Sequence, residues 1–76
     1  MSIVDTIALG QQAIENAKSG NVSESVKYFV AAHVSHNQTT IPVGKVYQFL
    51  RKYGNEPSES DLTTILEDIE GVQLTD

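Results

Sequence analysis

The 76 residues of this chain suffice for one small domain, and the lack of cysteine excludes both a disulfide framework and thiolate chemistry. The net charge of −5 is unevenly distributed, because residues 54–76 contain seven acidic residues and no basic one. Such a segment repels a phosphate backbone, which argues against nucleic-acid binding and favours a basic partner. We expect no membrane span, since no run of about 18 apolar residues occurs. We also expect no signal peptide and a cytoplasmic location.

Apolar side chains recur at helical spacing in the first half of the chain and predict two helices. The first spans residues 2–18, with Ser2 as its N-cap. Gly10 lies inside it, at a cost of roughly 1 kcal/mol relative to alanine. Gly20 marks the end of this helix, and the second helix spans residues 23–34. The short link between the two predicts an antiparallel hairpin.

The stretch TTIPVGKVYQFLRKYGNEPSESDLTTILEDIEG predicts two further amphipathic helices. The third helix spans residues 42–53 and ends before Gly54, which can take a positive φ. Pro57 prevents any continuation, and Ser58 is the expected N-cap of a fourth helix over residues 58–70. Residues 1–76 are therefore predicted to form one all-α domain of four short helices.

Two short segments outside the helices favour extended backbone. Ile41 precedes Pro42, and a residue before proline prefers the β region. In the tail, Val72 and Leu74 alternate with polar residues, so residues 71–76 are expected either to be extended or to fray.

No arrangement of residues predicts catalysis or a cofactor. His33 and His36 have the i, i+3 spacing of two metal ligands, but the second helix offers no acid on that side to complete a site. The chain has no glycine-rich phosphate loop and no recognisable nucleophile–base pair. We therefore expect a protein that is not an enzyme and that holds no metal or other cofactor.

The segment from Thr39 to Gly71 resembles the middle of a calmodulin-type EF-hand lobe. In that family a metal loop ends in a β-like isoleucine, and a helix, a glycine, a proline-containing link, a capped start and a second helix follow. The corresponding features here are Ile41, Val43–Tyr53, Gly54, Asn55–Pro57, Ser58–Asp61 and Leu62–Ile69. The resemblance covers about half the chain. The third and fourth helices are also similar to the N-terminal domain of the acidic ribosomal stalk proteins, which dimerise.

The chain departs from the EF-hand pattern at the metal ligands. If Ile41 is the eighth loop position, the loop runs from Val34 to Lys45 and has no carboxylate where calcium needs one; its ligand positions one, three, five and twelve are Val34, His36, Gln38 and Lys45. A second loop would start near Glu70, with no exiting helix after it. The resemblance thus implies a degenerate, calcium-independent hand. Either the first helix replaces the missing one, or the likeness is superficial.

These features favour a calcium-independent helical adaptor, similar to a single-lobe myosin light chain. It would receive a basic amphipathic helix of a partner protein in a groove between the second, third and fourth helices. The apolar residues of core and groove would be Phe29, Val30, Phe49, Leu50, Leu62, Ile65, Leu66 and Ile69. The acids that meet the partner's bases, improving association rate and specificity, would be Glu59, Glu67, Asp68 and Glu70.

Two other interpretations remain open. All eight apolar residues could simply fill the core, and with a core this small any groove must share residues with it. The alternative function is that of a small self-associating or inhibitory acidic protein, for example a viral one, that blocks a basic surface of its target. A homodimer is compatible with the sequence.

Overall fold

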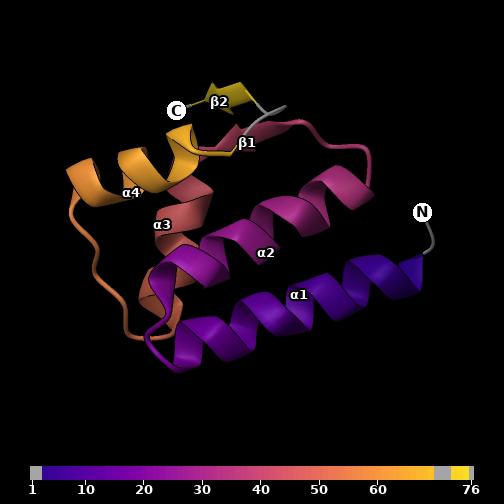
Figure 1. The fold of residues 1–76 in the computed structure, drawn as a ribbon, viewed down its shortest axis with the longest axis horizontal. Coiled ribbons are helices and arrows are strands. Elements are labelled where there is room, and N and C mark those ends of the chain that lie inside the picture. The colour runs from indigo at the N-terminus through magenta and orange to yellow at the C-terminus, as the bar shows by residue number, and fades with distance from the viewer. Residues whose placement is uncertain (1–2, 70–72, 76) are drawn as a thin grey trace.

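A computed structural model describes residues 3–69 and 73–75 of the chain, and within these ranges the fold is all-α, with four helices and one pair of very short strands. Figure 1 shows the order of the elements. Their bounds are α1 Ile3–Lys18, α2 Val22–Ser35, β1 Thr40–Pro42, α3 Val43–Lys52, α4 Glu59–Glu67 and β2 Gln73–Thr75. None of the described helices is long and apolar enough to cross a membrane.

Helices α1 and α2 lie side by side as an antiparallel hairpin, as the short link predicts (Figure 1). Gly20 makes the turn with φ +80°, a conformation that only glycine adopts without strain. The helices approach closely because small side chains face one another: Ala13 and Ala17 are 1% exposed, and the fully buried Ser25 donates its hydroxyl to the Ala13 carbonyl at 2.8 Å. At the other end the hydroxyl oxygens of Thr6 and Ser35 are 2.7 Å apart.

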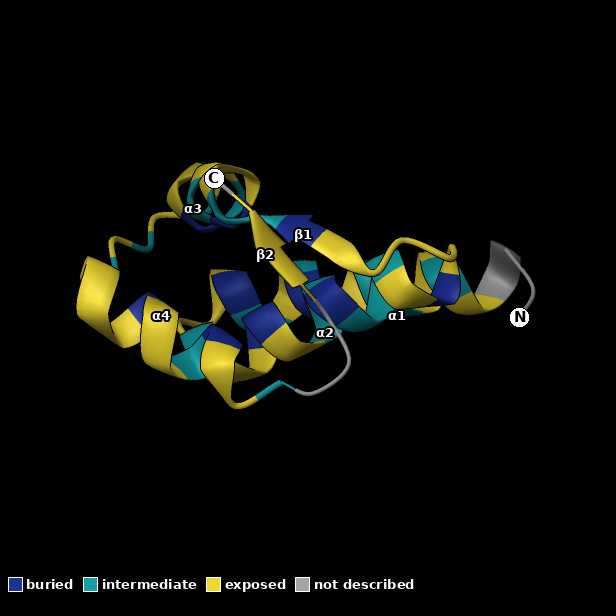
Figure 2. Cartoon of the chain, turned by 90° about the horizontal axis from the view of Figure 1, so that it is seen from above, coloured by how far each residue is buried: buried dark blue, intermediate teal, exposed yellow. Residues whose placement is uncertain are grey.

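The core lies between α2, α3, α4 and β1, and every side chain in it is aliphatic. Figure 2 shows buried stretches along α2 and exposed residues over the outer side of α4. Each core side chain is at most 2% exposed, and together they are Val26, Val30, Ile41, Val46, Leu50, Leu62 and Leu66. Helix α1 contributes no residue to this cluster, and its buried Ala13 and Ala17 pack against α2.

The connection from α3 to α4 is held by specific hydrogen bonds. Gly54 takes φ +87° after α3, and the side-chain amide of Asn55 then donates to the Ala17 carbonyl at 2.7 Å, tying the link to the end of α1. The capping role predicted for Ser58 is confirmed, since its hydroxyl accepts from the backbone N–H of Asp61 at 3.1 Å. These contacts fix where α4 starts.

The fourth helix is shorter than expected. It ends at Glu67, with Asp68 as its C-cap, whereas the sequence pattern predicted a helix through residue 70. Two acids at the end and no basic residue in the last turn interact unfavourably with the helix dipole, which favours an early end. The observed bounds of α2 and α3 differ from the predicted ones by one residue at each end.

Strands β1 and β2 pair in parallel, with Ile41 opposite Leu74. The extended geometry expected for Ile41 is confirmed, and its side chain is fully buried. The three residues of β2 are exposed, with Leu74 at 37%. A parallel pair needs a crossover connection, and here α3 and α4 lie within it (Figure 1).

Candidate functional site

Of the eight apolar residues proposed for core and groove, four lie in the core and four at its edge. Four are core residues that are at most 2% exposed and cannot reach a partner unless the core opens: Val30, Leu50, Leu62 and Leu66. The other four are half-buried and pack against the core edge: Phe29, Phe49, Ile65 and Ile69. Of the proposed acids, Glu59, Glu67 and Asp68 are exposed, and Glu70 lies outside the described residues.

The two phenylalanines belong to a row of rings between α2 and α3. Phe29 lies 4.5 Å from the His33 ring and 4.8 Å from the Phe49 ring, measured between centroids, and Phe49 lies 5.4 Å from Tyr53. The ammonium groups of Lys18 and Lys52 lie 5.9 and 5.7 Å from the Tyr53 ring centre. The rings are thus occupied with one another and stabilise the contact between the two helices.

An apolar pocket of about 430 Å³ opens where the start of α2 meets α4. It is lined by Val22, Pro57, Asp61, Thr64 and Ile65. The three α4 residues are spaced i, i+3 and i+4, so they share one face of that helix. Only Ile65 belongs to the residues proposed from sequence. Val22 is the first residue of the apolar stripe of α2. This periodicity is the sequence signal from which its role could have been predicted.

A second pocket, of about 370 Å³, lies between α3 and the α3–α4 link. It is lined by Tyr47, Arg51, Glu56 and Pro57. The Arg51 guanidinium lies 5.7 Å from the centre of the Tyr47 ring, and its Nε–H donates to the Tyr47 carbonyl at 3.4 Å. Because Pro57 borders both pockets, they form one surface that runs across the link, here called the Pro57 surface.

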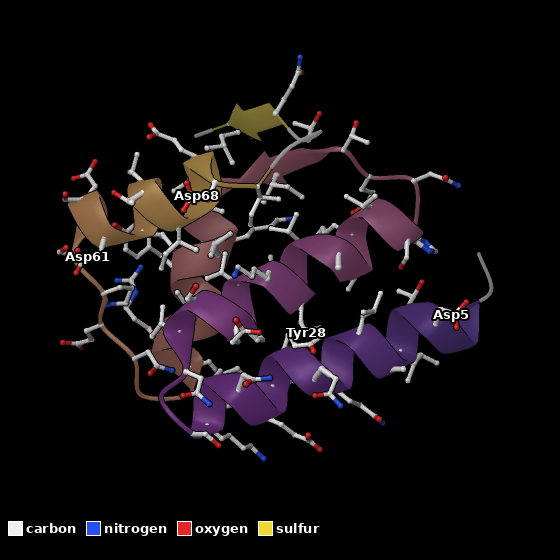
Figure 3. The ribbon with its side chains drawn as sticks, in the orientation of Figure 1. Asp5, Tyr28, Asp61 and Asp68 are labelled. Carbon is white, nitrogen blue, oxygen red and sulfur yellow. The ribbon has the colours of Figure 1, made fainter. Side chains whose placement is uncertain are left out.

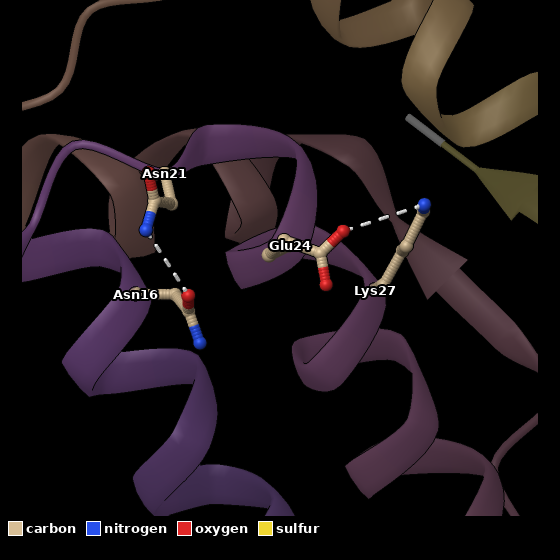
Figure 4. A network of polar contacts seen from close by, with 4 residues as sticks. All are labelled: Asn16, Asn21, Glu24 and Lys27. Carbon is tan, nitrogen blue, oxygen red and sulfur yellow. Dashed lines mark hydrogen bonds and ion pairs between the residues drawn. The ribbon is translucent and has the colours of Figure 1, made fainter.

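Helices α2 and α4 differ in the sign of the charges that they carry. On α2, the Glu24 carboxylate pairs with the Lys27 ammonium at 3.6 Å, and Asn21 donates to the Asn16 side chain at 3.4 Å (Figure 4). Such an exposed pair contributes about 0–1 kcal/mol but balances the local charge. On α4 every charged residue is acidic, and Figure 3 shows Asp61 and Asp68 on that helix, far from Asp5 at the start of α1. The charge on the α4 side of the apolar pocket is therefore negative only.

The two histidines line a smaller pocket of about 190 Å³ with Thr6, Ala32 and Gln38. His33 Nδ1 lies 2.9 Å from the Phe29 carbonyl, so that nitrogen carries the proton and donates. Within the described residues no group of three His, Cys, Asp or Glu side chains is placed to hold a metal ion. Val34 and Lys45, the ends of the segment that was compared with a calcium loop, lie in α2 and α3.

The Pro57 surface thus combines an apolar hollow, an acidic helix and one oriented guanidinium. Such a surface can bind an amphipathic segment, and the residues that line it do not form a nucleophile–base pair. No family model, curated protein or solved structure matched the chain.

Proposed function

We propose that this protein is a calcium-independent helical adaptor that binds a basic amphipathic helix of a partner protein on the Pro57 surface. The observation that carries the proposal is the apolar pocket beside α4, in a chain whose residues 54–76 hold seven acids and no base. The EF-hand resemblance stays part of the proposal for the helix pair α3–α4, and not as a calcium site.

The position of the pocket between α2 and α4 supports a helical ligand. Amphipathic helices bind by placing apolar side chains from successive turns into a hollow between helices. Three apolar residues line the pocket: Val22 from α2, Ile65 from α4 and Pro57 from the link before α4. One aliphatic side chain of a partner helix would enter there and displace water from these three residues.

The charge supports a basic ligand. Asp61 lines the pocket, and Glu59 is exposed in the same first turn of α4. Exposed charges of this kind mainly raise the association rate and exclude acidic partners, and they add only modestly to affinity. A helix with lysines or arginines flanking its apolar face fits this distribution.

A titration with a labelled basic amphipathic peptide tests the proposal. Its ends should be blocked, its apolar face should carry leucines, and its polar face should carry lysines. We expect amide chemical-shift changes centred on Val22, Asp61, Thr64 and Ile65. Asp61→Asn should weaken binding by about twofold to fivefold at low salt, as exposed charge pairs do.

The matched control is Glu15→Gln. Glu15 is also an exposed acid, but it lies on the side of α1 opposite Ala13 and Ala17, which face α2. Its replacement should leave affinity unchanged. Shift changes confined to α1 would show that the peptide binds there and not on this surface. Equal weakening by both substitutions would show that it is held by overall charge.

Self-association is a second candidate, favoured by one observation on α1. Ile7 is 55% exposed, and the nearby Gly10 has open space in the direction of a Cβ atom, so a second α1 could approach closely. Light scattering at increasing concentration should then show a dimer that Ile7→Ser abolishes. A monomer at all concentrations would exclude this candidate and leave the adaptor proposal intact.

A further inference from the structure

The second pocket of the Pro57 surface contains a charge of the wrong sign for a purely basic ligand. Arg51 is the one basic side chain among the described residues that line either pocket. A partner helix that carried only bases would meet a like charge there, which is unfavourable. We propose that the partner helix carries a carboxylate at this position and that Arg51 binds it. This inference rests on the proposed function and deepens it, because it states how the partner is oriented.

Arg51 is arranged to receive such a group. Its guanidinium lies over the Tyr47 ring at 5.7 Å, and its Nε–H donates to the Tyr47 carbonyl one turn earlier in α3. It forms no ion pair with any described residue. The two Nη groups therefore stay available for a carboxylate, and their geometry suits both of its oxygens. Less side-chain entropy is lost on binding when the donor is already oriented.

Glu56 defines the ligand further. It lines the same pocket as Arg51, yet no ion pair joins the two side chains. The pocket thus offers one charge of each sign that has no ion-pair partner among the described residues. A partner helix with an acid and a base one turn apart would satisfy both, since residues at i and i+4 share a face.

The two pockets together give the partner a direction. An apolar anchor at Val22 and Ile65 and a carboxylate at Arg51 would occupy two pockets that share Pro57 in their linings. A helix that enters the wrong way round would place its acid towards Asp61 and its bases at Arg51. The acid would then be repelled by Asp61 and would lose its contact with Arg51, so the contact between the carboxylate and Arg51 favours one orientation.

A set of peptides tests this assignment. Each is the basic amphipathic peptide with a single glutamate moved stepwise along one face, and each is compared with the same peptide carrying glutamine there. All have an amidated C-terminus, so that no terminal carboxylate is present. We expect one glutamate position to bind wild-type protein about threefold to tenfold more tightly than its glutamine counterpart, as an oriented arginine–carboxylate pair at a surface would.

The protein variants then assign the effect to Arg51. Arg51→Gln should remove the preference for glutamate, whereas Lys52→Gln, which removes the same charge from the next residue, should keep it. Tyr47→Phe retains the ring and should keep the preference, and Tyr47→Leu should reduce it. Arg51→Glu should instead prefer a peptide with lysine at that position. Circular dichroism melting curves would verify that each variant is folded.

The outcomes separate this inference from the proposed function. If the glutamate-free peptide binds but no glutamate position improves it, the carboxylate assignment is wrong and the adaptor proposal stands. Equal loss of the preference in Arg51→Gln and Lys52→Gln would also overturn the assignment. If no peptide binds, with or without glutamate, both proposals fail.

Discussion

The hydroxyl of Ser25 offers the sharpest test of how α1 is held on the rest of the fold. Ser25 is fully buried, and its hydroxyl donates to the Ala13 carbonyl of α1 at 2.8 Å. Ser25→Ala removes this hydrogen bond, whose net contribution is about 1 kcal/mol. Alanine also raises helix propensity by up to about 0.5 kcal/mol, which hides part of the loss.

Ser23→Ala is the matched comparison, because Ser23 is exposed on the same helix and receives the same gain in propensity. We expect Ser25→Ala to be less stable than Ser23→Ala by about 1 kcal/mol. For a domain of this size that corresponds to a difference in Tm of roughly 4–8 °C. Urea unfolding followed by circular dichroism measures the difference. Equal stability of the two variants would refute the view that this hydroxyl joins α1 to α2.

Four further predictions follow from local geometry. Ser58→Ala should lower the free energy of unfolding by about 1 kcal/mol in urea titrations, because the Asp61 N–H loses its hydrogen-bond acceptor. Ser58→Asp should keep most of that stability, because aspartate also caps helices. Gly54→Ala, at φ +87°, should destabilise the protein by about 1 kcal/mol, and Gly44→Ala, in a helix with open space around it, should stabilise it by up to about 1 kcal/mol. Leu62→Ala should cost about 2–5 kcal/mol, enough to leave a large unfolded fraction by circular dichroism at 25 °C. Calcium titration should leave the amide spectrum unchanged, and a saturable response would contradict the reasoning about the loop from Val34 to Lys45.

Local signals in the sequence predicted the helices well. The apolar stripes indicated each helix, Gly20 and Gly54 indicated two of the ends, and Ser58 indicated a start. Each of these signals depends on backbone conformation or on neighbours within one turn, so a single chain segment contains it. The extended Ile41 is predictable for the same reason, since Pro42 follows it.

The division of the apolar residues between core and edge was not predictable from such local signals. On α4, Leu62 and Leu66 are buried, but Ile65 is only partly buried, as is Ile69 just beyond the end of the helix. All four are large and apolar, and adjacent rows of such a helix differ by only about 60° around its axis. Which row faces inwards depends on how α4 lies against α2, and that is a property of the assembled fold.

The site depends even more on long-range contacts. Val22 and Ile65 come from helices far apart in the sequence, and Pro57 was interpreted only as a helix stop. The Asn55 amide reaches Ala17 across 38 residues, and no local pattern predicts that bond. The acidic character of residues 54–76 could be predicted, but not that one arginine from α3 would line the same surface.

The parallel pairing of β1 with β2 has a consequence for the folding kinetics. Hairpin α1–α2 joins neighbouring segments, so little chain entropy opposes it and it can form early. The contact of Ile41 with Leu74 closes a loop that contains two whole helices. The entropic cost of closing this loop must be met before the few hydrogen bonds between β1 and β2 form. We therefore expect β2 to dock last during refolding, and its amides to exchange with solvent by local opening long before those of α2.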